Sequence, residues 1–458
     1  GVQAGNGRTA LHIACMNGQA EAARTLLEPN GDRTVNVQDK DGWTALHRAC
    51  QEGRVDVVQV LLQCGADVGL QGRRGWSPLH AACQDGHVEI VRLLLTYGAD
   101  AAATVATGTA LHVACFNGHS DIVRVLLEHG ADPAVRSKKN GWTPLHAACP
   151  TGCAETVRLL LDRGADPNCR TGDPTRTVPS WNEDQLTPLL MAARNGHADV
   201  ARVLLEGGAS VGATDRQNDC TPLHAACGME GSAAVVKVLL EHGADVTART
   251  RDGKLPIHLA ASAGFPDTVA TLVQGGADLS VRDKTGYTAL HLASSAGHAE
   301  AVRALIDGGA DMEARAPDGG TALHQACAAG RVEAVKALVE RGAVLSPRLR
   351  SGGTPLLLAA RFGFNEIARV LVERGVDVSG SDKSGLTPLH VACREGNVGL
   401  VRMLLDAGAR PSPKSGWGRI TPLDLARAHG HTGVVNALRD AGARDAGPGP
   451  DCSTCSFM

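Results

Sequence analysis

A seven-residue phrase returns along almost the whole chain at nearly constant spacing. It first reads TALHIAC at residues 9–15 and last reads TPLDLAR at residues 421–427, with close variants between them. Its third residue is apolar in every copy and falls at Leu11, Leu46, Leu79, Leu111, Leu145, Leu189, Leu223, Ile257, Leu290, Leu323, Leu356, Leu389 and Leu423. The steps measure about 33 residues, apart from one step of 44 residues after Leu145. This periodicity predicts one extended array of small stacked units instead of a few globular domains.

Each copy of the phrase contains the local signals of two short helices. Thr opens the phrase in eleven of the thirteen copies and Pro follows in eight, which favours an N-cap and a first helical turn. A Gly such as Gly53 or Gly86 then ends the first helix. Apolar residues at helical spacing, such as Ile90, Val91 and Leu94, indicate a second helix. One unit cannot bury its own apolar face, so stacking on its neighbours supplies the core.

The composition supports the same architecture. Aromatic residues make up only 3% of the 458 residues, while Gly accounts for 55 of them, so the core must come from Leu, Ala and Val on many small elements. The formal net charge of −3 provides no long-range attraction for nucleic acid or acidic membranes. Most of the 14 Cys lie at regular positions within apolar stretches, which is typical of reduced thiols in a cytoplasmic or nuclear protein.

On these residues the chain resembles the ankyrin repeat family from residue 7 to about residue 445. The resemblance implies an all-α solenoid of stacked helix-turn-helix units with hairpin-like loops and a curved superhelix. Repeats one to five are expected over residues 7–168, an insertion loop over 169–184, repeats six to thirteen with a C-terminal cap over 185–445, and a flexible tail over 446–458. Residues 1–6 read as the end of a preceding turn, which suggests a truncated N-terminus. The last repeat, with Asp424 in place of the usual His, is typical of a terminal cap.

Two regular ladders of side chains look chemical but are interpreted as structural. One comprises His12, His47, His80, His112, His146, His224, His258, His291, His324 and His390, and the other comprises Cys15, Cys50, Cys83, Cys115, Cys149, Cys227, Cys327 and Cys393. Equivalent atoms of stacked helices lie about 10 Å apart, too far for shared zinc ligands or disulfides. The resemblance implies that the His side chains join neighbouring turns by hydrogen bonds, while the Cys act as small core residues. We expect no metal and no cofactor.

No pattern in the chain predicts catalysis. Gly208-Ala209-Ser210-Val211-Gly212 matches a nucleophile-elbow pattern, but it coincides with the turn that ends a second helix. The sequence contains no nucleotide-binding glycine loop and no H-E-x-x-H motif. Cys452 and Cys455 form a lone C-x-x-C without the second pair that a zinc site needs. We therefore predict a protein that is not an enzyme.

The residues that interrupt the repeat are the best candidates for specific binding. The position just before the first-helix N-cap is Trp in repeats two, three and five, and the resemblance places it on a hairpin fingertip: Trp43, Trp76 and Trp142. Basic residues flank these tips and four further side chains should line the same side: Arg73, Arg74, Lys138, Lys139, Met16, Gln51, Gln84 and Phe116. Trp is a preferred anchor at protein interfaces, so this set predicts a groove over repeats one to five for an acidic or phosphorylated peptide. The alternative is that each Trp packs against its neighbouring finger.

Three further features stay open at this point. The insertion of about eleven residues, which includes Trp181, is either part of the binding face or a tolerated surface loop. The final four residues, which begin at Cys455, resemble a prenylation signal, and Cys452 offers a second lipidation site; the alternative is an unmodified tail. Asn168 lies in a turn context that resembles hydroxylated sites of ankyrin proteins.

The leading hypothesis is an interaction scaffold or adaptor that binds partner proteins or peptides on the concave or fingertip face. An alternative is a targeting or regulatory region of a larger enzyme or channel whose N-terminal domain precedes residue 1. A third hypothesis, a ubiquitin-ligase substrate adaptor, is disfavoured because the residues after the last repeat are too few for the SOCS box that such family members carry. We expect a monomer in the cytoplasm or nucleus, with no nucleic-acid partner and with membrane tethering only if the tail is lipidated.

Overall fold

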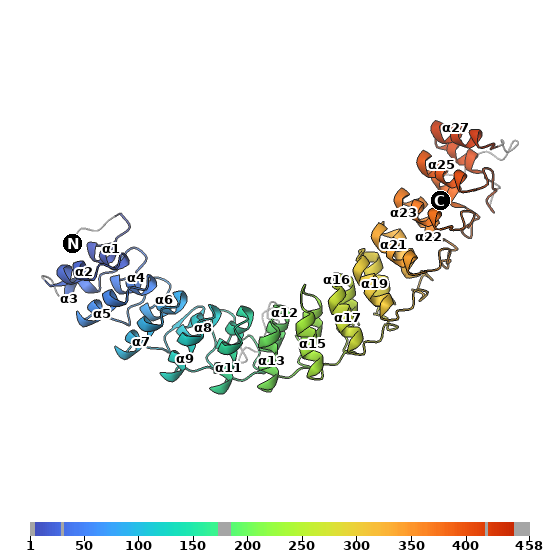
Figure 1. Cartoon of the computed structure of the whole chain (residues 1–458). Helices are drawn as coiled ribbons and strands as arrows, with labels where there is room; N and C mark the ends of the chain where they lie inside the picture. Colours follow the sequence, from blue (N-terminus) through green and yellow to red (C-terminus); the bar gives the residue numbers. More distant parts are fainter. Residues whose placement is uncertain (1–4, 29–31, 173–184, 417–419, 444–458) are drawn as a thin grey trace. The chain divides into compact units, whose positions relative to one another are not determined.

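The structure is a computed structural model that describes residues 5–28, 32–172, 185–416 and 420–443. It divides into two compact units, Gly1–Asp245 (unit 1) and Val246–Met458 (unit 2), and each is described by itself. Within each unit the chain forms pairs of short helices that follow one another in chain order (Figure 1). This arrangement confirms the expected all-α solenoid.

Within its described residues, unit 1 contains seven helix pairs, one for each repeat. They are α1 (Ala10–Met16) with α2 (Ala20–Leu27), α4 (Ala45–Gln51) with α5 (Val55–Gln63), α6 (Pro78–Asp85) with α7 (Val88–Thr96), α8 (Ala110–Phe116) with α9 (Ser120–Glu128), α10 (Pro144–Ala148) with α11 (Ala154–Asp162), α12 (Pro188–Arg194) with α13 (Ala198–Glu206), and α14 (Pro222–Cys227) with α15 (Ala233–Glu241). A short helix, α3 (Asp32–Val35), follows the first pair, and a 3-10 turn, η1 (Cys149–Thr151), extends α10.

Unit 2 contains six more pairs in the part of the chain that the structure describes. They are α16 (Pro256–Ala263) with α17 (Pro266–Gln274), α18 (Ala289–Ala296) with α19 (Ala299–Asp307), α20 (Ala322–Ala328) with α21 (Val332–Glu340), α22 (Pro355–Arg361) with α23 (Asn365–Glu373), α24 (Pro388–Arg394) with α25 (Val398–Asp406), and α26 (Pro422–Ala428) with α27 (Thr432–Asp440). Across the described ranges of both units, no helix is long and apolar enough to cross a membrane.

The first helix of each repeat begins where its sequence predicts. In α4, Thr44 is the N-cap, and a reciprocal pair of hydrogen bonds joins Thr44 to His47 in the third helical position. The helix then packs against its counterparts α1 and α6, and its Leu46 is fully buried between them. Gly53 follows with a φ of 71°, a left-handed conformation that lets the chain turn sharply into α5. The same sequence of signals repeats in both units.

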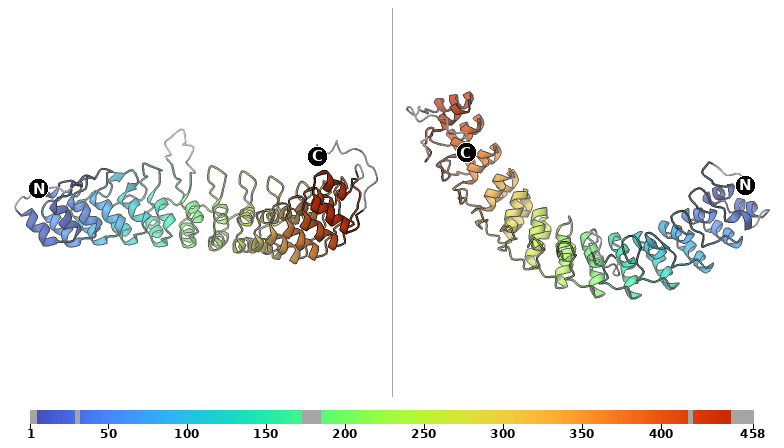
Figure 2. Two further views of the ribbon diagram at one scale, coloured as in Figure 1. Left: turned by 90° about the horizontal axis from the view of Figure 1, so that it is seen from above. Right: turned by 180° about the vertical axis from the view of Figure 1, so that it is seen from behind.

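The loops that precede the first helices form the fingers, which extend from one side of the helical layer within each unit (Figure 2, left). We number each finger by the repeat that it introduces: finger two is residues 36–43, three is 69–76, four is 101–108, five is 134–142 and six is 168–186. Finger four alone among the described fingers forms a strand pair, in which β1 (Thr104–Val105) lies antiparallel to β2 (Gly108–Thr109). The fingers carry most of the side chains predicted to bind partners.

Candidate interaction surface

In most repeats a His side chain joins the first helix to the next finger. His47 Nδ1 lies 2.8 Å from Thr44 Oγ1, and His47 Nε2 lies 3.0 Å from the carbonyl oxygen of Trp76. Burial lowers the pKa of His47 to about 4, so at pH 7 the ring is neutral and Nε2–H donates to the carbonyl. The same contact joins His12 to Trp43 and His112 to Trp142, at 2.9 Å each. The expected role of this ladder, a tie between neighbouring turns, is confirmed.

Hydrogen bonds within the chain therefore hold the backbone of each Trp fingertip in place. In finger two, Asp39 Oδ1 accepts hydrogen bonds from the backbone N–H groups of Asp41 and Trp43, at 2.9 and 3.0 Å. The Asp39 N–H also donates to the Trp43 carbonyl at 2.8 Å, which closes the turn. A side chain on such a turn loses little backbone entropy when it binds a partner.

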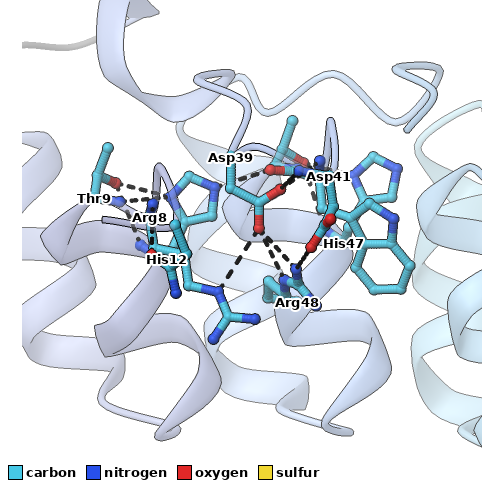
Figure 3. Close-up of polar contacts among 10 residues, drawn as sticks. Arg8, Thr9, His12, Asp39, Asp41, His47 and Arg48 are labelled. Carbon is cyan, nitrogen blue, oxygen red and sulfur yellow. Dashed lines mark hydrogen bonds and ion pairs between the residues drawn. The ribbon is translucent and has the colours of Figure 1, made fainter. Parts of the chain in front are cut away.

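Arg48 projects from α4 beneath finger two and is a residue that the sequence interpretation missed. Its guanidinium donates to Asp39 Oδ2 at 2.7 Å and to Asp41 Oδ2 at 3.1 Å, and Asp39 also lies near Arg8 (Figure 3). The same guanidinium sits 4.6 Å from the centre of the Trp43 ring, a cation–π arrangement. These hydrogen bonds hold the pKa of Asp39 below its usual range despite the burial of the carboxyl group. The sequence signal that could have identified Arg48 is its charge within the otherwise mainly apolar phrase TALHRAC.

Two adjoining hollows lie along the fingers of unit 1. The first, the basic hollow, has a volume of about 530 Å³ and is lined by Asp41, Trp43, Arg48, Gln51, Arg73, Arg74, Trp76 and Gln84. The second, the aromatic slot, has a volume of about 600 Å³ and is lined by Trp76, Gln84, Asp85, Thr107, His112, Val113, Phe116, Asn117, Lys139, Asn140, Trp142 and Ala147. Both include Trp76 and Gln84, so the hollows are neighbours that share one wall.

The structure brings nine of the predicted residues into this surface. They are Trp43, Gln51, Arg73, Arg74, Trp76, Gln84, Phe116, Lys139 and Trp142. Phe116 is the most exposed apolar member, with 57% of its surface accessible. Neither Met16 nor Lys138 lines either hollow, although the prediction grouped them with the others. Trp181, Cys452 and Cys455 lie outside the described residues.

The three fingertip Trp residues are partly packed and partly accessible, and their role in partner binding stays a prediction. Each is half-buried, and the Trp43 indole rests on finger three, since a methyl group at Gly72 would lie 2.7 Å from its Cδ1 atom. The ring of Trp76 lies 5.8 Å from that of His80, and Trp43 lies 5.5 Å from His47. The indoles of Trp43 and Trp76 therefore pack in part within the scaffold, and all three Trp residues line a hollow.

The charges of the two hollows differ. Arg73 and Arg74 are exposed at the rim of the basic hollow, where Arg48 is already engaged with Asp39 and Asp41. The aromatic slot carries one basic and one acidic residue, Lys139 and Asp85, which offset each other. The acidic members Asp41 and Asp85 were absent from the prediction, which had described the edges as basic.

The insertion begins and ends on finger six, beside finger five. Thr171 donates its N–H to the Leu186 carbonyl at 2.9 Å, and Arg136 of finger five donates to the Arg170 carbonyl at 2.6 Å. Residues 173–184 lie outside the described ranges. Whether the insertion contributes to binding stays a prediction.

Asn168 lies in the turn that opens finger six and is hydrogen-bonded through both atoms of its amide. Its Nδ2 donates to the Gly208 carbonyl at 3.0 Å, and its Oδ1 accepts from the Ser210 N–H at 2.7 Å. Ser210 therefore lies in the turn after α13, as expected, and not on a strand-to-helix elbow. Hydroxylation of Asn168 stays a prediction.

The buried thiols have no activating neighbours. The ladder Cys residues are buried and free, and burial raises the pKa of Cys15 to about 12. Cys169 Sγ approaches His146 Nδ1 at 3.7 Å, yet burial raises the pKa of this thiol and lowers that of His146 to about 4. Both groups are then neutral, so the pair is not a nucleophilic dyad. Over the described ranges, no group of three or more His, Cys, Asp or Glu side chains is placed to hold a metal ion.

The comparison with protein-family models agrees with this architecture. The family model described as "Ankyrin repeats (3 copies)" matches residues 1–72, 64–137, 102–171, 176–250, 257–348, 345–415 and 380–445. Among solved structures, the ankyrin repeat domain of human ASB11 is 30% identical, with a TM-score of 0.44 over 51% of this chain and 98% of that chain. The ankyrin repeat domain of Bcl-3, described as a unique member of the IkappaB protein family, is 34% identical, with a TM-score of 0.45 over 49% of this chain and 100% of that chain.

Ankyrin repeats are generally protein–protein interaction modules, and their fold is typically a non-enzymatic scaffold. The thirteen in-register copies, the His ladder and the matches to the family model, which together span most of the sequence, point to the same assignment. This chain belongs to the ankyrin repeat family.

Proposed function

We propose that this protein is a non-catalytic interaction scaffold that binds extended anionic peptide segments of partner proteins across fingers two to five. The observation that carries the proposal is the pair of adjoining hollows that share Trp76 and Gln84. Together they offer half-buried indole surface beside exposed guanidinium groups. Such a combination suits a peptide that brings both apolar contact and negative charge.

The charges at the rim support an anionic partner. Arg73 and Arg74 are exposed and adjacent, and no ion pair to either is found among the described residues. Their charges remain available to carboxylates or phosphates of a partner. Arg guanidinium groups suit both anions because their planar N–H donors match two acceptor oxygens.

The His ladder supports tight binding by keeping the surface in place. The carbonyls of Trp43, Trp76 and Trp142 are held by histidines of the preceding repeats. A surface built this way needs little ordering on association, so more of the contact energy appears as affinity. The free, buried Cys residues of the described ranges suit a reducing compartment, and we place the activity in the cytoplasm or nucleus with the protein as a monomer.

A selection of random twelve-residue peptides on the full chain tests this proposal. We expect enrichment of acidic peptides. Fluorescence anisotropy with an enriched peptide should show that Trp43→Ala/Trp76→Ala/Trp142→Ala weakens binding at least about tenfold, because buried Trp anchors dominate such interfaces. Arg73→Glu/Arg74→Glu should also weaken binding, and by less at high salt, since the charges are exposed. Replacing the carboxylates of the peptide by phosphoserine distinguishes the two anion sources.

The matched control is Tyr287→Ala, which removes an aromatic side chain from the same repeat position in unit 2. It should leave peptide affinity unchanged. The proposal fails if no acidic peptide is enriched. It also fails if the triple variant binds an enriched peptide as well as the wild type does while it unfolds at a much lower temperature, because the Trp residues would then be structural.

A further inference from the structure

Finger four departs from its neighbours in length and in its terminal residue. Thirty-two residues separate Leu79 from Leu111, against 33 in the preceding step and 34 in the next. This shorter finger forms a pair of two-residue antiparallel strands, in which Thr104 lies opposite Thr109 and Val105 opposite Gly108. Gly108 occupies the position that holds Trp in fingers three and five.

Gly108 cannot be replaced by a larger fingertip residue in this conformation. Its φ is 125°, and a Cβ atom there would lie 2.4 Å from His112 Cγ. The altered finger also interrupts the His ladder, because the buried Nε2 atom of His80 meets no hydrogen-bond partner. The Gly108 backbone lies near enough to favour the protonated ring but outside hydrogen-bonding geometry. Finger four thus carries no side chain at the position where fingers three and five carry an indole.

The space that this leaves is the aromatic slot. Trp76 of finger three and Trp142 of finger five border it from the two flanking fingers, and Val113 and Phe116 contribute from α8. Its exposed Phe116 and its volume of about 600 Å³ fit the concave, mainly apolar pockets that hold ligand groups. The slot has no excess of charge, whereas the adjoining basic hollow does.

We infer that the aromatic slot takes one bulky apolar side chain of the bound segment, while acidic residues of the same segment lie over Arg73 and Arg74. This inference rests on the proposed peptide-binding function and specifies its ligand. Charge complementarity decides which part of the segment lies in which hollow. Of the two hollows, only the basic hollow offers exposed guanidinium groups without acidic partners among the described residues. Trp76, which lines both hollows, lies between the two contacts.

The geometry also sets the spacing of the two contacts in the ligand. Neighbouring repeats are separated by about 10 Å, and an extended chain covers about 3.3 Å per residue. The apolar anchor and the nearest acidic residue should therefore lie about three positions apart. A ligand with this spacing reaches both hollows without a turn.

Thr107→Trp provides a direct test because it fills the slot from finger four. Thr107 is exposed and lines the slot, so the new indole occupies the space without entering the core. The matched control is Thr104→Trp, which places the same side chain on an exposed position of the same finger outside the lining. Both full-length variants are subjected to the random twelve-residue peptide selection beside the wild type.

The wild type and Thr104→Trp should enrich peptides with one Phe, Trp, Leu, Ile or Met about three positions from an acidic residue. Thr107→Trp should keep the acidic enrichment and lose the apolar one. In anisotropy, anchor→Ala in the peptide should weaken binding to the wild type at least about tenfold, and to Thr107→Trp by less than about twofold.

The outcomes separate the two proposals. If acidic peptides are enriched without any apolar anchor, or if Thr107→Trp enriches the anchor as strongly as the wild type does, the slot inference is wrong and the anionic binding function stands. If no acidic enrichment occurs on any form, the proposed function fails and the slot inference fails with it.

Discussion

Unit 1 and unit 2 share one scaffold and differ at their fingertips. In unit 2, His291 and His324 contact the carbonyls of Gly320 and Gly353 at 3.2 and 3.3 Å, just as His47 of unit 1 contacts that of Trp76. Outside finger four, the ladder histidine contacts only the backbone of the fingertip residue, so the hydrogen bond forms whether that residue is Gly or Trp. The fold therefore places little constraint on the residue at this position, which leaves it available for function.

The hollows reflect this difference. Fingers two and three of unit 1 border a hollow of about 530 Å³, whereas Gly353 in unit 2 borders one of only about 80 Å³. The basic side chains of the fingers differ as well, although not simply by unit, since Arg136 of unit 1 also donates to carbonyls of its own finger and of the next one. Arg315 of unit 2 donates to the carbonyls of Gly319 and Arg348, each at 2.8 Å, and so links adjacent fingers. Arg73 and Arg74 of unit 1 have no such contact among those found in the described chain, and their charges face the hollow.

Acid should affect the two units unequally, and this is the largest effect that we expect. Burial lowers the pKa to about 4 for three ladder histidines of unit 1 and for one of unit 2, namely His47, His80, His146 and His324. The unfolded chain, with a His pKa of about 6.5, binds more protons between pH 6.5 and pH 4. Stability is then complete above about pH 6.5 and declines as the pH falls toward 4, by about 2 kcal/mol per such histidine at pH 5.

Hydrogen exchange at pH 7 and pH 5, expressed as protection factors, measures this difference along the chain. Burial also lowers the pKa of other ladder histidines by less, which adds to the loss of stability in both units. These are His12 and His112 in unit 1, and His258, His291 and His390 in unit 2. We expect the larger loss of protection in unit 1. An equal loss in both units, or no loss at pH 5, would contradict the account.

The interrupted ladder at finger four offers the next comparison. His47→Ala removes a histidine with both ring nitrogens engaged and leaves the Trp76 carbonyl with the Gly72 N–H as its remaining donor, at a cost of about 2 kcal/mol. His80→Ala should cost about 1 kcal/mol less, since the Nε2 atom of His80 has no partner to lose. Urea unfolding of the full chain, with midpoints compared between the two variants, checks the difference. Equal destabilisation would show that the ladder is intact at His80.

The smallest effect concerns the basic residues of the fingers. Arg315→Ala breaks one hydrogen bond within its own finger and one to the next finger of unit 2, and it should lower stability by about 1 kcal/mol. Arg73→Ala should leave stability within about 0.5 kcal/mol of the wild type, as is usual for an exposed side chain. Thermal unfolding of the two variants provides the measurement. A marked loss for Arg73→Ala would mean that this charge supports the fold and is not reserved for a partner.

Much of the fold follows from local sequence. Thr44, Gly53 and the apolar periodicity predict their own helices and turns because each signal acts within a few residues. The fingertip Trp residues were predictable for the same reason, as departures at a fixed position of the repeat. The ladder contacts of His47 were expected from the family resemblance, because they join residues of different repeats.

The parts of the site that were not predicted depend on pairs of residues from different elements. The contact of Arg48 with Asp39 links a helix to the finger before it, and it fixes one edge of the basic hollow. The shorter spacing between repeats indicates that finger four differs from its neighbours. The slot between Trp76 and Trp142, however, is lined by residues of three fingers and follows only from their arrangement in space.

The central claim is that peptide ligands bind the fingers of unit 1 and not those of unit 2. Hydrogen exchange of the full chain with and without an enriched acidic peptide tests it directly. We predict added protection in fingers two to five and in the adjoining first helices α4, α6, α8 and α10, with fingers of unit 2 unchanged. Protection confined to unit 2, or spread equally over both units, would contradict the claim.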